Sequence, residues 1–356
     1  MVQNIPIPTI EPLEVLVQLS VTGLCHTDLV LAQGLVGACR SVLGHEGVGR
    51  IVALGSAVSS YSSVTLNSRV GVGWLHDTCG SCSICLRESG RRHCLAQRNH
   101  GRHVDGTFAG YVVVNAAFVQ PLPEGPPDEF LAPILCGGLT VYTALKRCGA
   151  RAGQWIVLLG AGGGLGTLGI QYAKAMGLLV IAVDGGKEKG AVATKLGADV
   201  YVDFTEGDVV AKVREASGGD GASAALVLAG SGRAYNEAIE MLGAFSTLVA
   251  VGIPKPGESL EVHPLKLIDL GIQVTGSLTG SLTDLNEAVA FVERGIVKPL
   301  VEVRSLEQLP LIAKEMEEGK VGNPEREDEM SVIPLLQIAN CFVLQISGKV
   351  VLKHQH

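Results

Sequence analysis

The sequence predicts an α/β protein with two parts, a β-rich domain and a domain built on a doubly wound parallel sheet. Up to about residue 136, short apolar runs such as EVLVQLSV and GVGRIVALG are broken by Gly and Pro, as is typical of strands. From Leu139 onward, runs of strand length alternate with segments of helical period. This alternation is typical of a parallel sheet covered by helices.

The elements of the second part follow in a regular order. Strands are expected at 155–159, 178–183, 200–202, 224–228, 247–251 and 272–275, and helices at 165–176 and 188–196. After about residue 280, a helix at 285–294 and an apolar segment at 299–303 return to the pattern of the first part. We therefore expect one domain at 1–136, a second at 137–278, and a return to the first at 279–356.

Composition and charge limit the classes of function. With 356 residues, 47% of them hydrophobic, the chain can form two domains with substantial cores. The net charge of −7, without a run rich in Lys and Arg, argues against a nucleic-acid partner. The apolar stretch 332–346 contains Pro334, Gln337 and Asn340, and is too short and polar to span a bilayer. Because no export signal begins the chain, we expect a cytoplasmic protein.

A glycine-rich loop follows the first predicted strand of the second part. The segment Gly160-Ala-Gly-Gly-Gly-Leu-Gly166 runs directly into a helix. Glycines there let the backbone turn sharply and approach a pyrophosphate, which then lies at the helix N-terminus. An ordinary turn-rich loop with another ligand is the alternative. We expect the coenzyme to contact a set of loop residues, namely Gly160, Gly163, Gly164, Leu165 and Gly166.

An acidic residue, Asp184, ends the second predicted strand, 18 residues after Gly166. A carboxylate at this position can bind the ribose hydroxyls of a dinucleotide and repels a 2′-phosphate. It therefore favours NAD over NADP. The alternative is a surface turn residue, since Gly185-Gly186 follow and Asp commonly begins turns.

Four cysteines lie close together in the segment CGSCSICLRESGRRHC. They are Cys79, Cys82, Cys85 and Cys94. This spacing lets one loop place four thiolates around a tetrahedral metal, for which zinc is the usual ion. Disulfide pairing is the alternative, and the absence of a secretory signal argues against it. Such a closed site supports structure and leaves no position for a substrate.

A second set of zinc-ligand types is spread along the first part. Cys25 lies in CHTD, His45 in GHEG and Cys136 in APILCGG. Two cysteines and one histidine would leave a fourth tetrahedral position open, as in a catalytic zinc site. Buried thiols and a core histidine are the alternative, because spacing alone does not bring these residues together.

Five motifs in the same chain carry a family resemblance. CHTD, GHEG, CGSCSIC…C, APILCGGLTVYTAL and GAGGGLGTLGIQYAKAMG together resemble the medium-chain zinc-dependent alcohol dehydrogenases, most of all the fungal, yeast-type branch. The resemblance extends to about residue 321. It implies a GroES-like catalytic domain, a Rossmann coenzyme domain and a catalytic zinc in the cleft between them.

The resemblance also implies roles for residues near the metal. Cys25, His45 and Cys136 would hold the catalytic zinc, with Glu46 as an alternate or supporting ligand and Asp28 orienting His45. Thr27 would hydrogen-bond the substrate oxygen. The four clustered cysteines would bind a structural zinc in a lobe at about 76–98.

Further roles concern the coenzyme. His26 would lie against the pyrophosphate, Asp184 and Lys189 would flank the adenosine ribose, and Val251 would lie near the nicotinamide. The implied enzyme is a homo-oligomer, either tetramer or dimer, with two zinc ions per subunit and NAD. It would transfer hydride between NAD(H) and a small primary or secondary alcohol or aldehyde. The alternatives are a biosynthetic reductase for a bulkier carbonyl compound and a coenzyme-binding relative with impaired catalysis.

Two segments depart from the yeast-type pattern. Between Asp28 and Gly44 the chain is shorter, lacks the tryptophan that narrows the pocket, and has Val30 where relatives have a proton-relaying histidine. Trp74 is the remaining candidate for the pocket wall. We therefore expect a roomier pocket than one built for ethanol. The second departure is an atypical insertion at about 322–347, which is long for a loop inside a compact domain.

Overall fold

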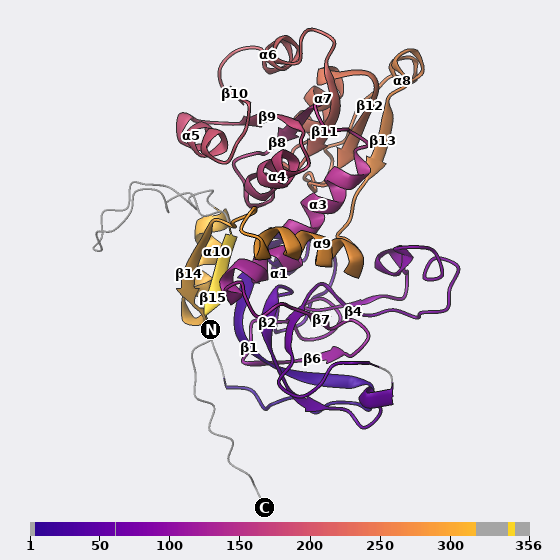
Figure 1. Ribbon diagram of the computed structural model, residues 1–356, viewed down its shortest axis with the longest axis vertical. Helices are drawn as coiled ribbons and strands as arrows, with labels where there is room; N and C mark the ends of the chain where they lie inside the picture. The colour runs from indigo at the N-terminus through magenta and orange to yellow at the C-terminus, as the bar shows by residue number, and fades with distance from the viewer. Residues whose placement is uncertain (1–3, 61, 318–340, 346–356) are drawn as a thin grey trace, which may run out of the picture. The chain divides into compact units, whose positions relative to one another are not determined.

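The computed structural model describes residues 4–60, 62–317 and, for the backbone, 341–345 (Figure 1). These residues form two compact units. The first contains the chain up to Cys136 together with 301–317 and 341–345, and the second contains Gly137–Leu300. The change of unit at Cys136 coincides with the change of pattern in the sequence.

The first unit is built on a mixed sheet, in the order β14-β15-β1-β2-β3-β7, with β6 also paired to β1. Its strands are β1 (Glu14–Leu24), β2 (Gly47–Leu54), β3 (Arg69–Val72), β6 (Tyr111–Asn115), β7 (Gln120–Pro121), β14 (Val301–Ser305) and β15 (Cys341–Gln345). Buried valines and leucines, such as Val15, Val17, Leu19 and Val70, form the core. The expected β-rich domain is confirmed.

Short elements connect and flank this sheet. They are α1 (His26–Ala32), η1 (Val58–Ser60), β4 (Leu75–Asp77), η2 (Gly90–His93), β5 (Arg98–Asn99), α2 (Asp128–Leu131), η3 (Ala132–Leu135), η4 (Leu306–Gln308) and α10 (Leu309–Glu317). Strands β4 and β5 pair with each other in a separate small sheet. Most of the predicted site residues of the first unit lie in the segments between these elements, and two, His26 and Thr27, lie within α1.

The second unit is a parallel sheet of the doubly wound type, in the order β10-β9-β8-β11-β12-β13. Its strands are β8 (Trp155–Leu159), β9 (Leu179–Asp184), β10 (Val200–Asp203), β11 (Ala222–Val227), β12 (Leu242–Ala250) and β13 (Gln273–Gly276). Every neighbouring pair is parallel. The predicted Rossmann domain is confirmed, with β12 beginning earlier than the sequence pattern indicated.

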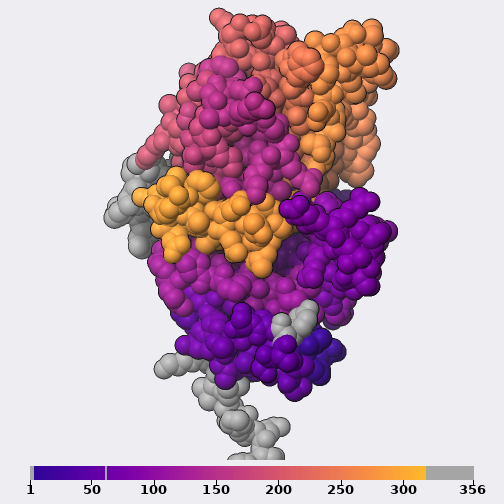
Figure 2. Space-filling view, turned by 45° about the vertical axis from the view of Figure 1, so that its right-hand side comes forward, coloured from indigo at the N-terminus to yellow at the C-terminus, as the bar shows by residue number. Residues whose placement is uncertain are grey.

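Helices connect these strands, and one further helix precedes the first strand and another follows the last. They are α3 (Gly137–Arg147), α4 (Gly164–Ala175), α5 (Lys187–Lys195), α6 (Val209–Ala216), α7 (Gly232–Met241), α8 (Pro264–Leu270) and α9 (Leu282–Glu293). Strand β13 is one edge of the sheet and β10 is the other. Strand β13 and α8 belong to the orange atoms at the top right of Figure 2. None of the helices in the described ranges is long and apolar enough to cross a membrane.

Helix α9 lies with the second unit, so the return to the first unit occurs at Leu300/Val301 and not at the predicted 278/279. Polar contacts explain this difference. Lys146 of α3 pairs with Asp284 at 2.8 Å and with Glu287 at 2.6 Å, both on α9. The Tyr142 hydroxyl also donates to Glu287, at 2.8 Å. The sequence pattern marks α9 as a helix but does not show which helix it packs against.

The predicted insertion at 322–347 lies mostly outside the described residues. Within it, Cys341–Gln345 forms β15, which pairs antiparallel with β1 and parallel with β14. Part of the segment is therefore a strand of the first unit, which the sequence analysis did not expect.

Candidate metal and coenzyme sites

Cys25, His45, Glu46 and Cys136 converge in the first unit, although they come from three distant segments. Cys25 caps the N-terminus of α1, His45 and Glu46 directly precede β2, and Cys136 follows η3. One possible ligand atom from each of the four residues lies within 4.8 Å of the others. The Cys25 and Cys136 sulfurs are 3.9 Å apart. The structure therefore brings together the three residues that spacing alone could not.

The Asp28 carboxylate organises this cluster from the first turn of α1. It is buried, and it accepts hydrogen bonds from the backbone N–H of Cys25 and of Gly44, each at 3.1 Å. The same carboxylate lies 3.1 Å from Nδ1 of His45. Because Asp28 engages Nδ1, Nε2 is the ring nitrogen that remains for a metal. This is the orienting role that the resemblance implies for Asp28.

The four side chains differ in charge because of their contacts. The Cys136 thiol donates to the Cys25 sulfur, which holds the pKa of Cys25 well below its ordinary value against the effect of burial. The same contact, together with burial, raises the pKa of Cys136. Burial lowers the pKa of His45, but the Asp28 carboxylate outweighs it, and the pKa lies above its ordinary value. Burial raises the pKa of Glu46.

This donor set fits a zinc ion. Two sulfurs and one imidazole nitrogen are the ligand types that zinc prefers, and the buried acid supplies a further oxygen. A divalent cation would also offset the negative charge that gathers on the Cys25 sulfur and the nearby carboxylates.

Gly23, at the end of β1, makes room for Glu46. A Cβ atom at position 23 would lie 1.9 Å from Oε2 and 2.9 Å from Cβ of Glu46. The Gly23 N–H also donates to the Glu46 carbonyl, at 2.9 Å. The buried position of Glu46 therefore depends on the absence of a side chain at 23. Sequence reasoning missed this residue, because its partner lies in a distant segment, just before β2.

Other predicted residues surround the cluster to different degrees. Thr27 is half-buried, and its N–H donates to the Cys25 sulfur at 3.5 Å. His26, the first residue of α1, is exposed, and Val30 on the same helix is half-buried. The Trp74 ring packs edge-on against His45, with ring centroids 5.1 Å apart at an angle of 77°. Trp74 is therefore in contact with a candidate metal ligand.

The four clustered cysteines form a second candidate metal site. One sulfur from each of Cys79, Cys82, Cys85 and Cys94 lies within 4.8 Å of the others. The Cys79 sulfur is 3.5 Å from that of Cys94 and 3.8 Å from that of Cys85. A backbone N–H from Ser81 lowers the pKa of Cys79 to about 6. Four sulfurs in one loop fit a closed tetrahedral zinc site.

The glycine-rich loop joins β8 to α4 in the second unit. Gly160 has φ +88°, a conformation that glycine adopts without strain. A Cβ atom on Gly166 would lie 2.3 Å from the Gly160 carbonyl oxygen, so the loop closes only with glycine there. Gly163 caps α4 without a side-chain acceptor, followed by Gly164 and Leu165 in the first turn. The backbone donors at this helix end suit a phosphate group.

Asp184 ends β9 beside this loop. Its carboxylate accepts from the N–H groups of Gly162 and Gly185 and pairs with the Lys189 ammonium, each at 2.8 Å. The loop and the predicted ribose-binding residues are therefore adjacent. Val251 follows β12 and donates its N–H to the Val227 carbonyl, at 3.2 Å.

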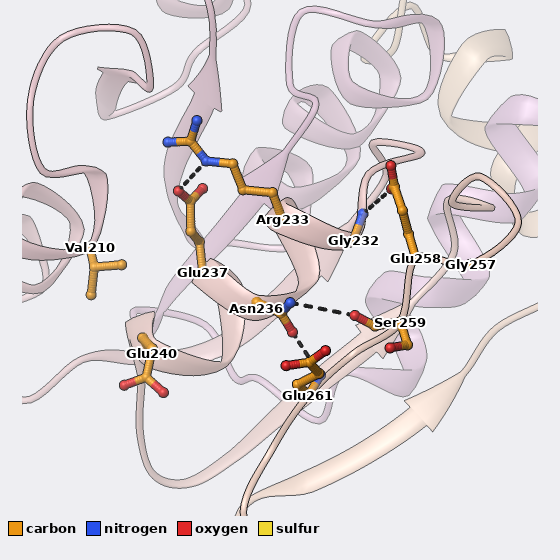
Figure 3. A pocket seen from close by; sticks show the side chains of 10 residues that line it. All are labelled: Val210, Gly232, Arg233, Asn236, Glu237, Glu240, Gly257, Glu258, Ser259 and Glu261. Atoms are coloured by element: carbon orange, nitrogen blue, oxygen red, sulfur yellow. Dashed lines mark hydrogen bonds and ion pairs between the residues drawn. The ribbon is translucent and has the colours of Figure 1, made fainter.

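A surface hollow of about 550 Å³ lies elsewhere in the second unit, between α7 and residues 257–261 (Figure 3). Its polar groups largely satisfy one another. Glu258 accepts from the Gly232 N–H at 2.7 Å, and Arg233 pairs with Glu237 at 2.7 Å. None of the predicted site residues lines it, and we assign it no role.

Comparisons with known proteins agree with this geometry. Residues 11–124 match the alcohol dehydrogenase GroES-like domain, and residues 164–294 match the zinc-binding dehydrogenase family. Alcohol dehydrogenase 1 of Emericella nidulans is 39% identical over 325 residues, which cover 90% of this chain and 91% of the relative. The crystal structure of the alcohol dehydrogenase from Aeropyrum pernix has a TM-score of 0.82 at 28% identity, covering 97% of this chain and 96% of that one. Acetophenone reductase from Geotrichum candidum, in complex with NAD, has a TM-score of 0.78 at 25% identity, covering 97% and 93%.

The fit between Gly23 and Glu46 generates a test. Gly23→Ala should displace Glu46 and reduce zinc affinity at Cys25, His45 and Cys136 by about 10–100-fold, the usual effect of disturbing groups that support metal ligands. The measurement is zinc retained after dialysis against a graded series of chelator concentrations. Gly110→Ala is the matched control, since a Cβ there meets no atom within 4 Å. Equal zinc retention in the two variants would contradict the assignment.

Proposed function

We propose, because this chain belongs to the medium-chain zinc-dependent alcohol dehydrogenases, that it transfers hydride between NAD(H) and a primary or secondary alcohol or the corresponding carbonyl compound. The convergence of Cys25, His45 and Cys136 around one point, with His45 held by Asp28, carries this proposal. The glycine loop and Asp184 in the same chain support a dinucleotide coenzyme.

The residues of the first unit would divide the work. Cys25, His45 and Cys136 would hold a zinc ion, with Glu46 as an alternate or supporting ligand, and the ion would act as a Lewis acid. Thr27, beside Cys25, would hydrogen-bond the substrate hydroxyl and pass its proton outward, and Val30 cannot continue that transfer. A second zinc, held by Cys79, Cys82, Cys85 and Cys94, would stabilise the lobe without taking part in the reaction.

The coenzyme would contribute the hydride chemistry, and residues of the second unit would bind it. The loop residues Gly160, Gly163, Gly164, Leu165 and Gly166 would receive the pyrophosphate, with His26 of the first unit against it. Asp184 and Lys189 would flank the adenosine ribose, and Val251 would lie near the nicotinamide. Because the Asp184 carboxylate would repel a 2′-phosphate, we propose NAD as the coenzyme.

The substrate pocket is proposed to accept more than ethanol. Val30 replaces a larger side chain of yeast-type relatives, and the segment that follows it is shorter. The similarity to acetophenone reductase, whose name indicates an aromatic ketone, supports this proposal. A biosynthetic reductase for a bulkier carbonyl compound is the second candidate, and the same observations favour it.

We also propose that the protein is a homo-oligomer, joined through the β13 edge of the parallel sheet. On β13 and α8, Val274 is 44% exposed, Leu265 55% and Ile268 74%. Exposed apolar side chains beside an edge strand favour pairing with a second copy. The proposed cytosolic location rests on the thiol clusters, because ligand thiols must stay reduced.

The first test combines metal analysis with kinetics. The wild-type protein should hold two zinc ions per chain and oxidise NADH with a panel of aldehydes and ketones. Cys136→Ser should lose one zinc and abolish turnover while NADH binding, followed by fluorescence, persists, because all the proposed coenzyme contacts except His26 lie in the second unit. An NADH-binding protein that holds both zincs but turns over no carbonyl compound would refute the enzymatic proposal.

The same panel tests the size of the pocket. A preference for acetaldehyde over benzaldehyde would contradict the roomier pocket.

A second test concerns coenzyme choice. Asp184→Asn should lower the ratio of kcat/KM for NAD over NADP about tenfold or more, because it removes the charge that repels a 2′-phosphate. Asp199→Asn is the control, since Asp199 accepts from the Val180 N–H at the opposite end of β9. An unchanged ratio in the Asp184 variant would show that this carboxylate does not select the coenzyme.

A third test concerns assembly. Light scattering should give the wild-type protein the mass of two or four chains, and Ile268→Lys should shift it to smaller particles because a buried ammonium is costly. Leu66→Lys, on a turn of the first unit with 58% exposure, should leave the mass unchanged. A wild-type mass equal to one chain would overturn the proposal.

A further inference from the structure

His100 is a fully buried histidine that takes no part in either metal cluster. It follows β5, and none of its side chain is exposed. Its ring Nδ1 lies 2.9 Å from the Gly73 carbonyl, and its backbone N–H donates to the Trp74 carbonyl at 3.0 Å. One residue therefore holds two successive carbonyl groups of the segment that leads into β4.

The segment held in this way reaches the candidate zinc site. Trp74 packs its ring edge-on against the His45 ring at 5.1 Å, and His45 is a proposed zinc ligand. A shift of the Gly73–Trp74 backbone would move the indole relative to His45. The contacts thus run without a gap from His100 through Trp74 to the metal cluster.

Further groups contact the His100 ring. Burial keeps His100 neutral by lowering its pKa to about 3, so the ring carries one proton. Backbone carbonyls contact both ring nitrogens, since Gly73 lies 2.9 Å from Nδ1 and Val113 lies 3.2 Å from Nε2. We place the proton on Nδ1, which makes the shorter contact. Nδ1 of His76 lies 3.4 Å from Nε2. Nε2 of His76 in turn faces the Glu14 carboxylate at 3.4 Å.

We propose that His100 is a positioning residue, which holds the Gly73–Trp74 backbone and thereby sets the Trp74 ring against His45. Its effect on catalysis rests on the proposed function, whereas its effect on the environment of Trp74 does not. The required group is a donor at the position of Nδ1. Variants that keep this donor should therefore differ from variants that lose it, both in the spectra of Trp74 and in kinetics.

The chain offers a direct spectroscopic probe, because Trp74 and Trp155 are its two tryptophans. In a Trp155→Phe background, the emission and near-ultraviolet circular dichroism of the full-length protein report on Trp74. His100→Gln, which places its amide near Nε2, should shift both signals. His100→Asn, which keeps an amide N–H near Nδ1, should retain them. His103→Gln is the control, because it changes a different contact of the same turn, the one in which the exposed His103 ring accepts from the Asn99 N–H at 3.2 Å.

Kinetics should follow the spectra. We expect kcat/KM for a small aldehyde to fall about tenfold in His100→Gln and to stay within about twofold in His100→Asn, since small misplacements of groups at the site carry large costs. The affinity for NADH should be unchanged in both. A general loss of folding would instead reduce kcat/KM and the affinity for NADH together.

Each outcome bears on the proposal. Trp74 spectra that are equal in folded Gln and Asn variants would overturn it, as would a folded Gln variant with wild-type kinetics. If the wild-type protein turned over no carbonyl compound, the proposed function would fail, while a Trp74 shift confined to the Gln variant would still support the positioning role. Identical shifts in the His103 control would show that any change in the turn disturbs Trp74, and would overturn the specific role of His100.

Discussion

The buried Asp28 carboxylate is the interaction on which the metal cluster of the first unit depends. It ties the start of α1, through the Cys25 N–H, to the segment before β2, through the Gly44 N–H and the His45 ring. Two of the proposed ligands are thus held by the same carboxylate. Hydrogen bonds to a charged acceptor are stronger than those to a neutral one. The third, Cys136, joins them through its sulfur contact with Cys25. A cluster built from distant segments needs such an anchor, because no local turn holds it together.

The second unit uses a carboxylate in a comparable way. Asp184 ends a strand and binds the N–H of Gly162 in the neighbouring loop, as Asp28 binds that of Gly44. In both units the acid holds a glycine-containing segment whose own side chains could not fix it. Both carboxylates are buried, but their neighbours differ: Asp28 contacts a proposed metal ligand, whereas Asp184 lies beside the helix end that suits a phosphate. Asp28 therefore orients a side chain that would bind the metal, and Asp184 is placed to contact the coenzyme itself.

The features that could be predicted from sequence are those whose partners lie close along the chain. The four-cysteine loop, the Gly160–Gly166 loop and the strands of the parallel sheet all depend on local spacing or period. The set of Cys25, His45 and Cys136 required a family resemblance, because their encounter depends on the whole sheet. Gly23 could not be found at all, since its need for space arises from Glu46, which lies far along the chain, just before β2. His100 was missed for the same reason, and α9 was assigned to the first unit because its ion pairs with α3 join distant residues.

The position of β15 has a consequence for how the protein is made. This strand, from the far end of the chain, lies between β14 and β1 in the sheet of the first unit. Strand β6 covers residues 14–18 of the same edge of β1, so only residues 21–24 of β1 wait for β15 while the continuous second unit is synthesised. Exposed strand edges attract other strands. This short part of β1 is therefore an edge that stays open to other strands until the end of the chain is synthesised.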